Sequence, residues 1–327
     1  MREIIFFQRI YKEKIWGGNR LRTLYEMDIP SDHTGECWLV SAHPEGRTRI
    51  RSGTFQGLTL DELWGRDRSI FGDIDGDEFP LLIKMIDASD DLSIQVHPDD
   101  AYALVKGNGT KGKTECWYVL DCAAGGEVIL GHNARTSEEL ACMVRDGKWE
   151  QLLKRVPVKK GDFIYVGSGT IHALKQGMMV LEIQQPSDTT FRLYDYGRLE
   201  NGKPRKLHIE ESLEVVKVPY NPESREFLIE KSENFVRTVL AETSFFSVYR
   251  YEIKGKITLL QDKPFLIIGV VEGQGFIDGT SLKTGDHLML PFGYGAYELE
   301  GKMTLIVSTK EGLVHQAEDL IEKGIAS

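Results

Sequence analysis

Short apolar segments separated by turn signals recur along most of the chain, and this pattern restricts the folds that it can form. Segments of this kind predict β-strands, and turns such as Ala-Gly-Gly and Lys-Lys-Gly-Asp predict that neighbouring strands are antiparallel. We therefore predict a mainly β fold, with strands at 78–86, 92–97, 115–122, 127–132, 162–167, 178–185, 246–253, 265–271 and 288–293. Helical spacing occurs near 57–72, near 136–155 and at 208–217.

Two of the strand-and-turn stretches resemble each other. One begins at Lys159 and the other at Leu282, and both contain Gly-Asp, an apolar strand, a turn with glycine and a further strand. Aligning the two Gly-Asp pairs places His172 opposite Ala296. We interpret the stretches as parts of two related β-barrels, one delivering an imidazole to its mouth and the other a methyl group. Coincidence is the alternative, because Gly-Asp turns are common.

The chain length also favours two domains. A chain of 327 residues is longer than one hydrophobic core usually serves. Proline and polar residues gather at 220–240, and we place the boundary there. The prediction is a first domain at 1–230, with helical segments near 57–72 and 136–155, and a second, barrel-like domain at 231–327.

The charge and composition exclude several classes of partner. A net charge of -10 argues against nucleic acid and anionic membranes. The chain has no apolar run long enough for a membrane span, and its start lacks the pattern of a signal peptide, so we expect a cytoplasmic location. The four cysteines show neither metal-binding spacing nor a disulfide framework, and we interpret them as buried or unreactive thiols.

The stretch LSIQVHPDD, residues 92–100, combines strand alternation with polar side chains. Gln95 and His97 are two residues apart, so both project from the same side of the predicted strand. Pro98 suits the end of that strand because it has no backbone N–H to donate. An amide oxygen and an imidazole side by side at a strand end form a candidate ligand pair.

A second predicted strand, in GKTECWYVLDC, adds charged groups. Lys113 and Glu115 share one face of it, and Cys116 lies on the other face. If this strand is the neighbour of the first, Glu115 faces the same space as the amide and the imidazole. His172, in GTIHAL, begins another strand and supplies a second imidazole.

Two imidazoles, one carboxylate and one amide oxygen form a donor set with one formal negative charge. Such a set suits zinc, iron, manganese or cobalt, and the lack of a thiolate disfavours a purely structural zinc site. Each residue alone has a simpler interpretation, because a histidine on a strand is usually a hydrogen-bonded structural residue and a glutamate usually faces solvent. Gln95 and His97 share one face of a strand, however, and Glu115 and His172 come from other strands of a plausible barrel. A metal site is therefore as good an interpretation as four separate structural residues.

The stretch QQPSDTTFRLYDYGR, residues 184–198, follows an apolar strand and should emerge at one end of the barrel. It carries Arg192 and Arg198. The planar guanidinium suits a phosphate or a developing oxyanion, so we expect this segment beside an anionic ligand. For Arg198, a surface salt bridge is an equally good interpretation.

Together these stretches resemble the type I phosphomannose isomerases (mannose-6-phosphate isomerases), a zinc-dependent cupin family. LSIQVHPDD, GKTECWYVL, GTIHAL and QPSDTTFRLYDYGR occur in the family's order, and YKEKIWGGNRL and GECWLVSAHPEG look like its opening blocks. The resemblance runs from about residue 6 to residue 200, and the remaining third fits the shorter bacterial forms. It implies two cupin (jelly-roll-like) β-barrels with a small helical insertion, the second barrel lacking a metal site.

The resemblance also implies roles for individual residues. The implied ligands of one Zn²⁺ per chain are Gln95, His97, Glu115 and His172. Arg192 falls on the family's catalytic arginine, and Lys113 matches the lysine two residues before the glutamate ligand. The candidate substrate-binding residues are Trp16, Lys111 and Arg198.

The implied reaction is the interconversion of mannose 6-phosphate and fructose 6-phosphate by proton transfer between C2 and C1, through an enediol or enediolate. A metal with an open position would polarise the carbonyl. Arg192 would help to stabilise the negative charge that develops on oxygen. Lys113 is the candidate base, because a nearby cation lowers the pKa of an amine, and a zinc-bound hydroxide or another carboxylate is an alternative.

Two other functions stay open at this point. Two histidines and a carboxylate also suit iron, as in a dioxygenase, and a non-catalytic paralogue would bind the sugar phosphate without converting it. The expected partner is a small sugar phosphate, with no nucleic acid and no membrane. We expect a monomer or a weak homo-oligomer.

Overall fold

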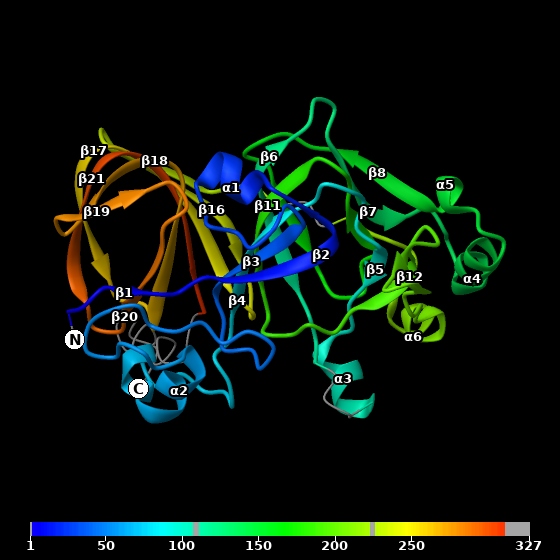
Figure 1. Cartoon of the computed structure of the whole chain (residues 1–327), viewed down its shortest axis with the longest axis horizontal. Helices are drawn as coiled ribbons and strands as arrows, with labels where there is room; N and C mark the ends of the chain where they lie inside the picture. The colour runs from blue at the N-terminus through cyan, green and yellow to red at the C-terminus, as the bar shows by residue number, and fades with distance from the viewer. Residues whose placement is uncertain (1, 107–110, 223–225, 311–327) are drawn as a thin grey trace, which may run out of the picture. The chain divides into compact units, whose positions relative to one another are not determined.

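The computed structural model describes residues 2–106, 111–222 and 226–310, in two compact units (Figure 1). Unit 1 comprises Met1–Arg9, Leu39–Leu81 and Glu226–Ser327, and unit 2 comprises Ile10–Trp38 and Leu82–Arg225. The chain passes from unit 2 to unit 1 for the last time between residues 225 and 226, near the predicted boundary at residue 230. The structure adds that two N-terminal segments group with the C-terminal strands. The division into domains at 1–230 and 231–327 stays a prediction, and 223–225 and 311–327 lie outside the described residues.

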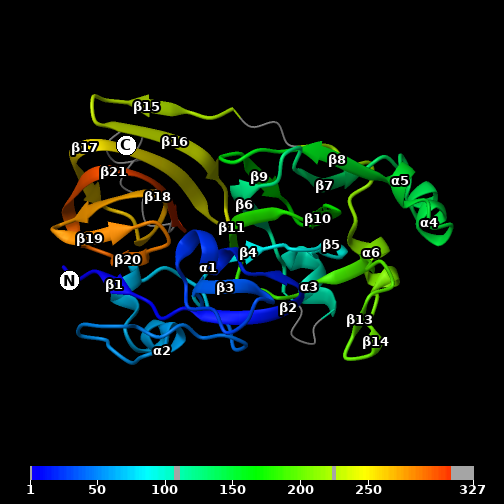
Figure 2. The same cartoon turned by 45° about the horizontal axis from the view of Figure 1, so that its top comes forward.

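Unit 2 is built around two sheets with antiparallel pairing (Figure 2). The six-stranded sheet has the order β2 (Ile10–Gly18), β3 (Thr34–Val40), β4 (Leu82–Asp87), β11 (Met178–Gln184), β6 (Glu115–Cys122) and β9 (Phe163–Val166). The five-stranded sheet has the order β12 (Phe191–Tyr194), β5 (Ile94–Val96), β10 (His172–Leu174), β7 (Glu127–His132) and β8 (Leu153–Pro157). The other elements are a β13 (Leu199–Glu200) and β14 (Lys203–Pro204) hairpin, α1 (Arg20–Tyr25), α3 (Asp100–Lys106), α4 (Ser137–Arg145), α5 (Trp149–Leu152) and α6 (Ile209–Val215).

Unit 1 contains a single large sheet among its described residues. Its strand order is β1 (Ile5–Phe6), β20 (His287–Pro291), β18 (Phe265–Ile277), β21 (Gly295–Thr309), β17 (Ser247–Gln261), β16 (Phe235–Glu242) and β15 (Ile229–Lys231), and β19 (Thr280–Lys283) pairs with β18. Helix α2 (Leu60–Arg66) and a 3₁₀ turn (Arg68–Phe71) also belong to this unit. The predicted mainly β, cupin-like fold is confirmed, although the strand orders describe open sheets and not closed barrels.

Helices α2 and α4 begin at threonine caps. Thr59 caps α2 in a capping box, in which its backbone N–H donates to the Glu62 carboxylate at 2.8 Å. The cap of α4 is Thr136, whose hydroxyl accepts a hydrogen bond from the Glu139 N–H at 3.2 Å. No helix in the described part of the chain is long and apolar enough to cross a bilayer.

Strand β5 separates two hydrophobic cores in unit 2. Ile94 and Val96 belong to the outer core, which also contains side chains of α4, α5 and α6. Gln95, between them, projects to the opposite face of the strand. That face meets the inner core, which contains Trp117 of β6. The alternation of β5 therefore aims polar side chains at the space between the two sheets of unit 2.

The internal repeat is visible in the two Gly-Asp turns. In each turn the aspartate carboxylate accepts a bond from the backbone N–H three residues before it, at 2.9 Å for both Lys159–Asp162 and Lys283–Asp286. Gly161 and Gly285 have φ values of 89° and 93°. Glycine adopts such angles without steric cost. The two turns thus share the same bond and similar backbone angles, and a common origin of the two stretches stays an interpretation.

The repeat shifts by one residue after its second turn. Ala296, which the sequence aligns with His172, is exposed, whereas the next residue, Tyr297, is 1% exposed and lies in the core of unit 1. Gly295 has φ 83°, while its counterpart Ile171 has no positive φ, and this difference displaces the side-chain alternation. The prediction that the methyl group of Ala296 faces the interior is therefore wrong. A tyrosine ring faces the interior there.

Candidate active site

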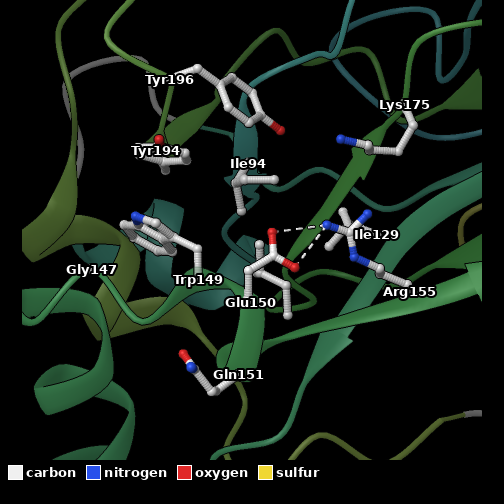
Figure 3. Close-up of a pocket in the computed structure, with 11 residues that line it drawn as sticks. Ile94, Ile129, Gly147, Trp149, Glu150, Gln151, Arg155, Lys175, Tyr194 and Tyr196 are labelled. Atoms are coloured by element: carbon white, nitrogen blue, oxygen red, sulfur yellow. Dashed lines mark hydrogen bonds and ion pairs between the residues drawn. The ribbon is translucent and has the colours of Figure 1, made fainter.

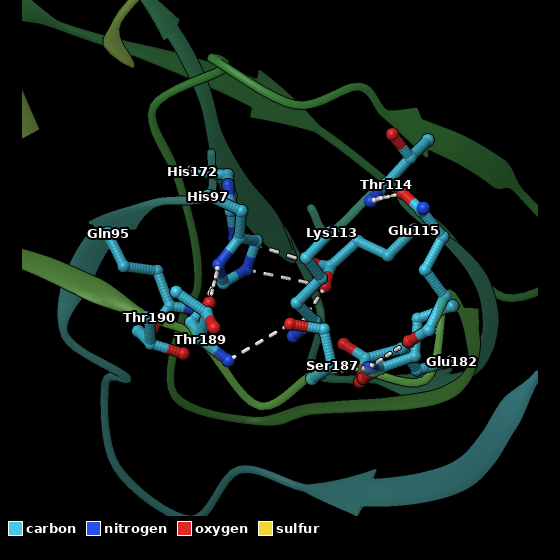
Figure 4. A network of polar contacts seen from close by, with 12 residues as sticks. Gln95, His97, Lys113, Thr114, Glu115, His172, Glu182, Ser187, Thr189 and Thr190 are labelled. Atoms are coloured by element: carbon cyan, nitrogen blue, oxygen red, sulfur yellow. Dashed lines mark hydrogen bonds and ion pairs between the residues drawn. The ribbon is translucent and has the colours of Figure 1, made fainter. Parts of the chain in front are cut away.

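Two histidines and a glutamate from three strands meet inside unit 2 (Figure 4). His97 follows β5, Glu115 begins β6 and His172 begins β10. Glu115 Oε2 lies 3.4 Å from His97 Nε2, and Glu115 Oε1 lies 3.4 Å from His172 Nε2. No side chain of the three is more than 1% exposed. Three of the four predicted ligands therefore form one compact, buried cluster.

The cluster forms between the two sheets of unit 2 and not along one of them. Strand β5 pairs with β10 and β12, whereas β6 pairs with β11 and β9. The possibility that β5 and β6 are neighbours in one sheet is therefore wrong. His172 lies directly opposite Gln95 on the five-stranded sheet, and Glu115 reaches His172 from the six-stranded sheet.

Backbone carbonyls determine which ring nitrogen of each histidine faces the cluster. His97 Nδ1 lies 2.8 Å from the Thr189 carbonyl oxygen, and His172 Nδ1 lies 2.9 Å from the Thr170 carbonyl oxygen. A carbonyl oxygen only accepts, so each Nδ1 carries the proton and donates. Each Nε2 is then an unprotonated nitrogen aimed at Glu115, which is the arrangement of metal-binding histidines.

Three buried atoms of the cluster have no hydrogen-bond partner among the described residues: His97 Nε2, Glu115 Oε1 and Glu115 Oε2. Lys113 Nζ lies 2.8 Å from Glu115 Oε2 as an ion pair, but the contact is not aligned as a hydrogen bond. Buried polar atoms nearly always find a partner. Lone pairs that converge with no proton between them suit a bound cation. His97, Glu115 and His172 could therefore hold a metal ion.

Gln95 lies beside this cluster as the fourth predicted ligand. Its amide nitrogen is 3.3 Å from His172 Nε2, and its amide oxygen is 3.4 Å from the Ser93 hydroxyl. Rotating the amide exchanges its oxygen and nitrogen positions at almost no steric cost. Gln95 is therefore placed to offer an oxygen to a metal held by the other three residues.

Charge and burial act together on the titration of the cluster. Burial raises the pKa of Glu115, but Lys113 and the two histidines outweigh it and hold the pKa well below its usual range. Burial, followed by the charge of Lys113, lowers the pKa of His97 to about 3. Burial also lowers the pKa of His172. A deprotonated carboxylate and neutral imidazoles are the forms that bind metals.

A second buried pair, which the sequence analysis missed, adjoins the cluster. Lys84 of β4 and Glu182 of β11 are opposite each other in the six-stranded sheet, with Nζ and Oε2 2.8 Å apart. Trp117 Nε1 donates to the other Glu182 oxygen at 3.0 Å. Burial lowers the pKa of Lys84, but Glu182 and Glu36 outweigh it and raise the pKa above its usual range. Lys84 is therefore a firmly protonated cation near the site.

A sequence signal for this pair existed. Lys84 and Glu182 are each the only charged residue in otherwise apolar runs, LLIKMI and MMVLEI. Charged side chains are seldom fully buried unless they are paired. A single Lys and a single Glu in two predicted core strands therefore indicated a buried ion pair, although not its location beside the cluster.

Arg192 lies on the same side of its sheet as the cluster. It is directly opposite Gln95 in the β12–β5 pairing. Its Nε atom is buried without a hydrogen-bond partner among the described residues. Burial and the nearby Arg205 lower its pKa. A half-buried guanidinium with an unused donor, two strands from His172, is available to an anion at the site.

The three predicted substrate-binding residues have different surroundings. Trp16 is buried in the inner core with Trp117. Lys111 is exposed, and its backbone carbonyl accepts a bond from Ser187 at 3.2 Å. Arg198 donates to Asp195 at 2.6 Å and to the Asp91 carbonyl. The contacts of Arg198 are thus those of a structural salt bridge, and none reaches the cluster among the residues described.

Unit 1 carries an apolar side chain where unit 2 carries Glu115 of the cluster. By the alignment of the repeats, Leu290 corresponds to Val166. Val166 pairs with Glu115, and Leu290 pairs with Leu266. Leucine thus replaces the glutamate, and no group of three potential metal-binding side chains other than the cluster is present in the described part of the chain.

Comparison with known proteins agrees with the geometry. Residues 5–118 match the family model of the phosphomannose isomerase type I catalytic domain, and residues 236–310 match that of the mannose-6-phosphate isomerase cupin domain. The chain is 49% identical over 311 residues to mannose-6-phosphate isomerase ManA of Bacillus subtilis (strain 168), covering 94% of this chain and 98% of that protein. The chain belongs to the type I phosphomannose isomerase family.

Solved structures of mannose 6-phosphate isomerases share its fold. The crystal structure of the mannose 6-phosphate isomerase from Bacillus subtilis is 46% identical, with a TM-score of 0.92, and covers 94% of this chain and 99% of that chain. A structure of mannose 6-phosphate isomerase bound with zinc and yttrium is 17% identical, with a TM-score of 0.73, and covers 94% of this chain and 99% of that chain. At this lower identity, the likeness shows the fold alone.

Proposed function

We propose that this chain is a metal-dependent mannose-6-phosphate isomerase, which interconverts mannose 6-phosphate and fructose 6-phosphate. The observation that carries the proposal is the buried cluster of His97, Glu115 and His172, whose lone pairs converge without a protein partner. Membership of the type I phosphomannose isomerase family supports the choice of reaction. The partner is then a sugar phosphate.

We propose zinc as the metal, one ion per chain. Its ligands would be His97, Glu115, His172 and the amide oxygen of Gln95, a nitrogen and oxygen set with one negative charge. When bound, zinc would supply a Lewis acid that polarises the substrate carbonyl. The Thr189 and Thr170 carbonyls would hold the two imidazoles in the tautomer that binds a cation.

The remaining charged residues would handle the proton and the negative charge. Transfer of a proton between C2 and C1 develops negative charge on the substrate oxygen, and Arg192 has a buried N–H with no partner among the described residues to stabilise it. Lys113 stays our candidate for the base that moves the proton. Glu182 is the competing carboxylate, because it is buried and adjoins Trp117 beside His172.

A coupled isomerase assay tests the proposal. Purified protein should convert mannose 6-phosphate, lose the activity on removal of metal by a chelator and recover it when zinc is restored. Full activity in protein shown by elemental analysis to be metal-free would overturn the metal requirement. Tight binding of mannose 6-phosphate by zinc-loaded protein without turnover would instead indicate a non-catalytic paralogue.

The same preparation distinguishes a dioxygenase. Anaerobic turnover of the sugar phosphate excludes a need for oxygen, whereas oxygen uptake with a phenolic substrate would favour that alternative. We also propose a cytoplasmic location, which fits the finding that none of the four cysteines, all in the described part of the chain, forms a disulfide. A monomer or weak homo-oligomer remains our expectation for the assembly.

A further inference from the structure

A pocket of about 400 Å³ lies on the outer side of the five-stranded sheet of unit 2 (Figure 3). Ile94 of β5 and Ile129 of β7 contribute apolar side chains to it, and both belong to the outer core. Gln95, the neighbour of Ile94, projects to the other face of the sheet, toward the metal cluster. The pocket is therefore separate from the proposed active site.

An irregularity in β12 places an aromatic ring in this pocket. Arg192 is opposite Gln95 on the active-site face, and two residues later Tyr194 would normally point the same way. The register shifts between them, so that Tyr194 is opposite Ile94 and lies on the pocket face. There it stacks on Trp149 of α5, with ring centroids 4.6 Å apart and an interplanar angle of 21°.

A strained residue adds a third ring. Tyr196 has φ 58°, in the left-handed region, which costs a bulky side chain on the order of 1 kcal/mol. Its hydroxyl has no hydrogen-bond partner among the described residues, and Figure 3 shows it pointing across the rim toward Lys175. A glycine or asparagine would form this turn with less strain. Strain of this kind is characteristic of functional positions, and here it brings a polar-tipped ring to the pocket.

The charged side chains at the pocket are already paired. Arg155 donates to both oxygens of Glu150 at 3.0 and 3.1 Å, and Lys175 pairs with Asp91 just outside the pocket. The pocket therefore offers hydrogen-bond donors and acceptors but no uncompensated charge that would select an ion. Apolar side chains and aromatic rings form its remaining surface.

We propose that this pocket binds a neutral carbohydrate ring, such as a free monosaccharide or the terminal unit of a short glycan. A sugar ring has an apolar C–H face, which suits the aromatic and isoleucine side chains, and hydroxyls that both donate and accept, which suit Glu150, Arg155, Lys175 and the Tyr196 hydroxyl. The volume lies within the range of small-molecule sites. The proposal concerns binding alone and does not depend on the isomerase reaction.

Intrinsic fluorescence provides a direct binding assay because Trp149 lies in the pocket, and a Trp149→Phe variant identifies its share of the signal. Titrating the full-length protein with D-mannose, D-glucose or methyl α-D-mannoside should give a saturable change, with a dissociation constant on the order of 1 mM for so small a ligand. Inorganic phosphate should give none. A Glu115→Gln variant, impaired at the metal cluster, should bind these sugars as the wild type does.

Tyr196→Gly is the decisive variant because it removes the ring and relieves the backbone strain, and circular dichroism checks that the fold survives the loss of the ring's packing on the outer core. It should weaken sugar binding about tenfold or more and leave isomerase activity unchanged. Asn201→Gly is the matched control, since Asn201 also has a positive φ, 53°, but lies exposed in the β13–β14 hairpin away from the pocket. It should bind the sugars normally. Glu150→Gln, on an exposed side chain, should also weaken binding.

Three outcomes would overturn the proposal. The first is the absence of any saturable response to all of the sugars. The second is sugar binding that survives both Tyr196→Gly and Glu150→Gln unchanged. The third is binding that requires a phosphate on the sugar or is lost in Glu115→Gln, because either result would assign the signal to the metal cluster and not to this pocket.

Discussion

Replacing Lys113 with methionine should destabilise the metal-free protein by several kcal/mol. Lys113 Nζ lies 2.8 Å from Glu115 Oε2, and the two side chains are 5% and 0% exposed. At an effective dielectric constant near 20, the attraction at this separation is about 6 kcal/mol. The variant leaves the Glu115 carboxylate buried without its cation, and removing one partner of a buried pair typically costs ~3–5 kcal/mol. We expect a loss of that size in the free energy of unfolding.

Zinc should restore part of this loss. A cation bound at Glu115 would supply the positive charge that the variant lacks, and a ligand that binds only the folded state adds to its stability. The gain in unfolding free energy on saturation with zinc should therefore be larger for Lys113→Met than for the wild type.

Urea unfolding followed by circular dichroism, with a chelator and with excess zinc, measures both effects. Lys148→Met is the matched control, because Lys148 Nζ is 2.7 Å from Asp146 but the two side chains are 53% and 41% exposed. An exposed pair of this kind contributes less than ~1 kcal/mol. The reasoning is refuted if Lys113→Met in chelator costs no more than Lys148→Met, or if zinc stabilises the wild type and Lys113→Met equally.

Three further predictions follow from the same structure. Arg192→Lys should lower kcat/KM by about 10²–10³ with unchanged zinc content, because an ammonium lacks the planar fork of a guanidinium, and steady-state kinetics with metal analysis would check this. Glu182→Gln should leave Lys84 without its buried partner and reduce the free energy of unfolding by ~3 kcal/mol in urea unfolding. Burial lowers the pKa of His287 from 6.5 to about 4, so the unfolded state takes up the proton first as the pH falls. Stability should therefore be complete above pH 6.5 and fall by about 3 kcal/mol by pH 4, and a His287→Gln variant should lack this part of the pH dependence.

The local pattern of the sequence predicts much of the fold because backbone geometry is local. Segment 115–122 and segment 127–132 coincide with β6 and β7. The same alternation correctly placed Gln95 and His97 on one side of β5, and Glu115 on the face of β6 away from Cys116. These are consequences of how successive side chains alternate across a strand, which holds for any strand whatever its partners.

Other features depend on which distant strands pair. The motif GTIHAL shows that His172 begins a strand, but not that this strand lies beside β5 in a sheet that excludes β6. Arg192 and Tyr194 have the spacing of one strand face, yet a register shift sends them to opposite faces. Ala296 has the aligned position, yet Gly295 turns Tyr297 inward in its place. One unusual backbone angle or one displaced pair reverses an inference from spacing.

The sequence by itself determined the mainly β class, the residues that are candidate ligands and the family. Alternation, turn residues and motif order are properties of short stretches, and short stretches are enough to establish them. The tertiary structure alone decided that the candidate ligands meet between two sheets, that Lys84 and Glu182 form a buried pair beside them and that Arg198 donates to the Asp91 carbonyl. These facts depend on the packing of segments about 100 residues apart, which only the burial of whole sheets against each other can specify.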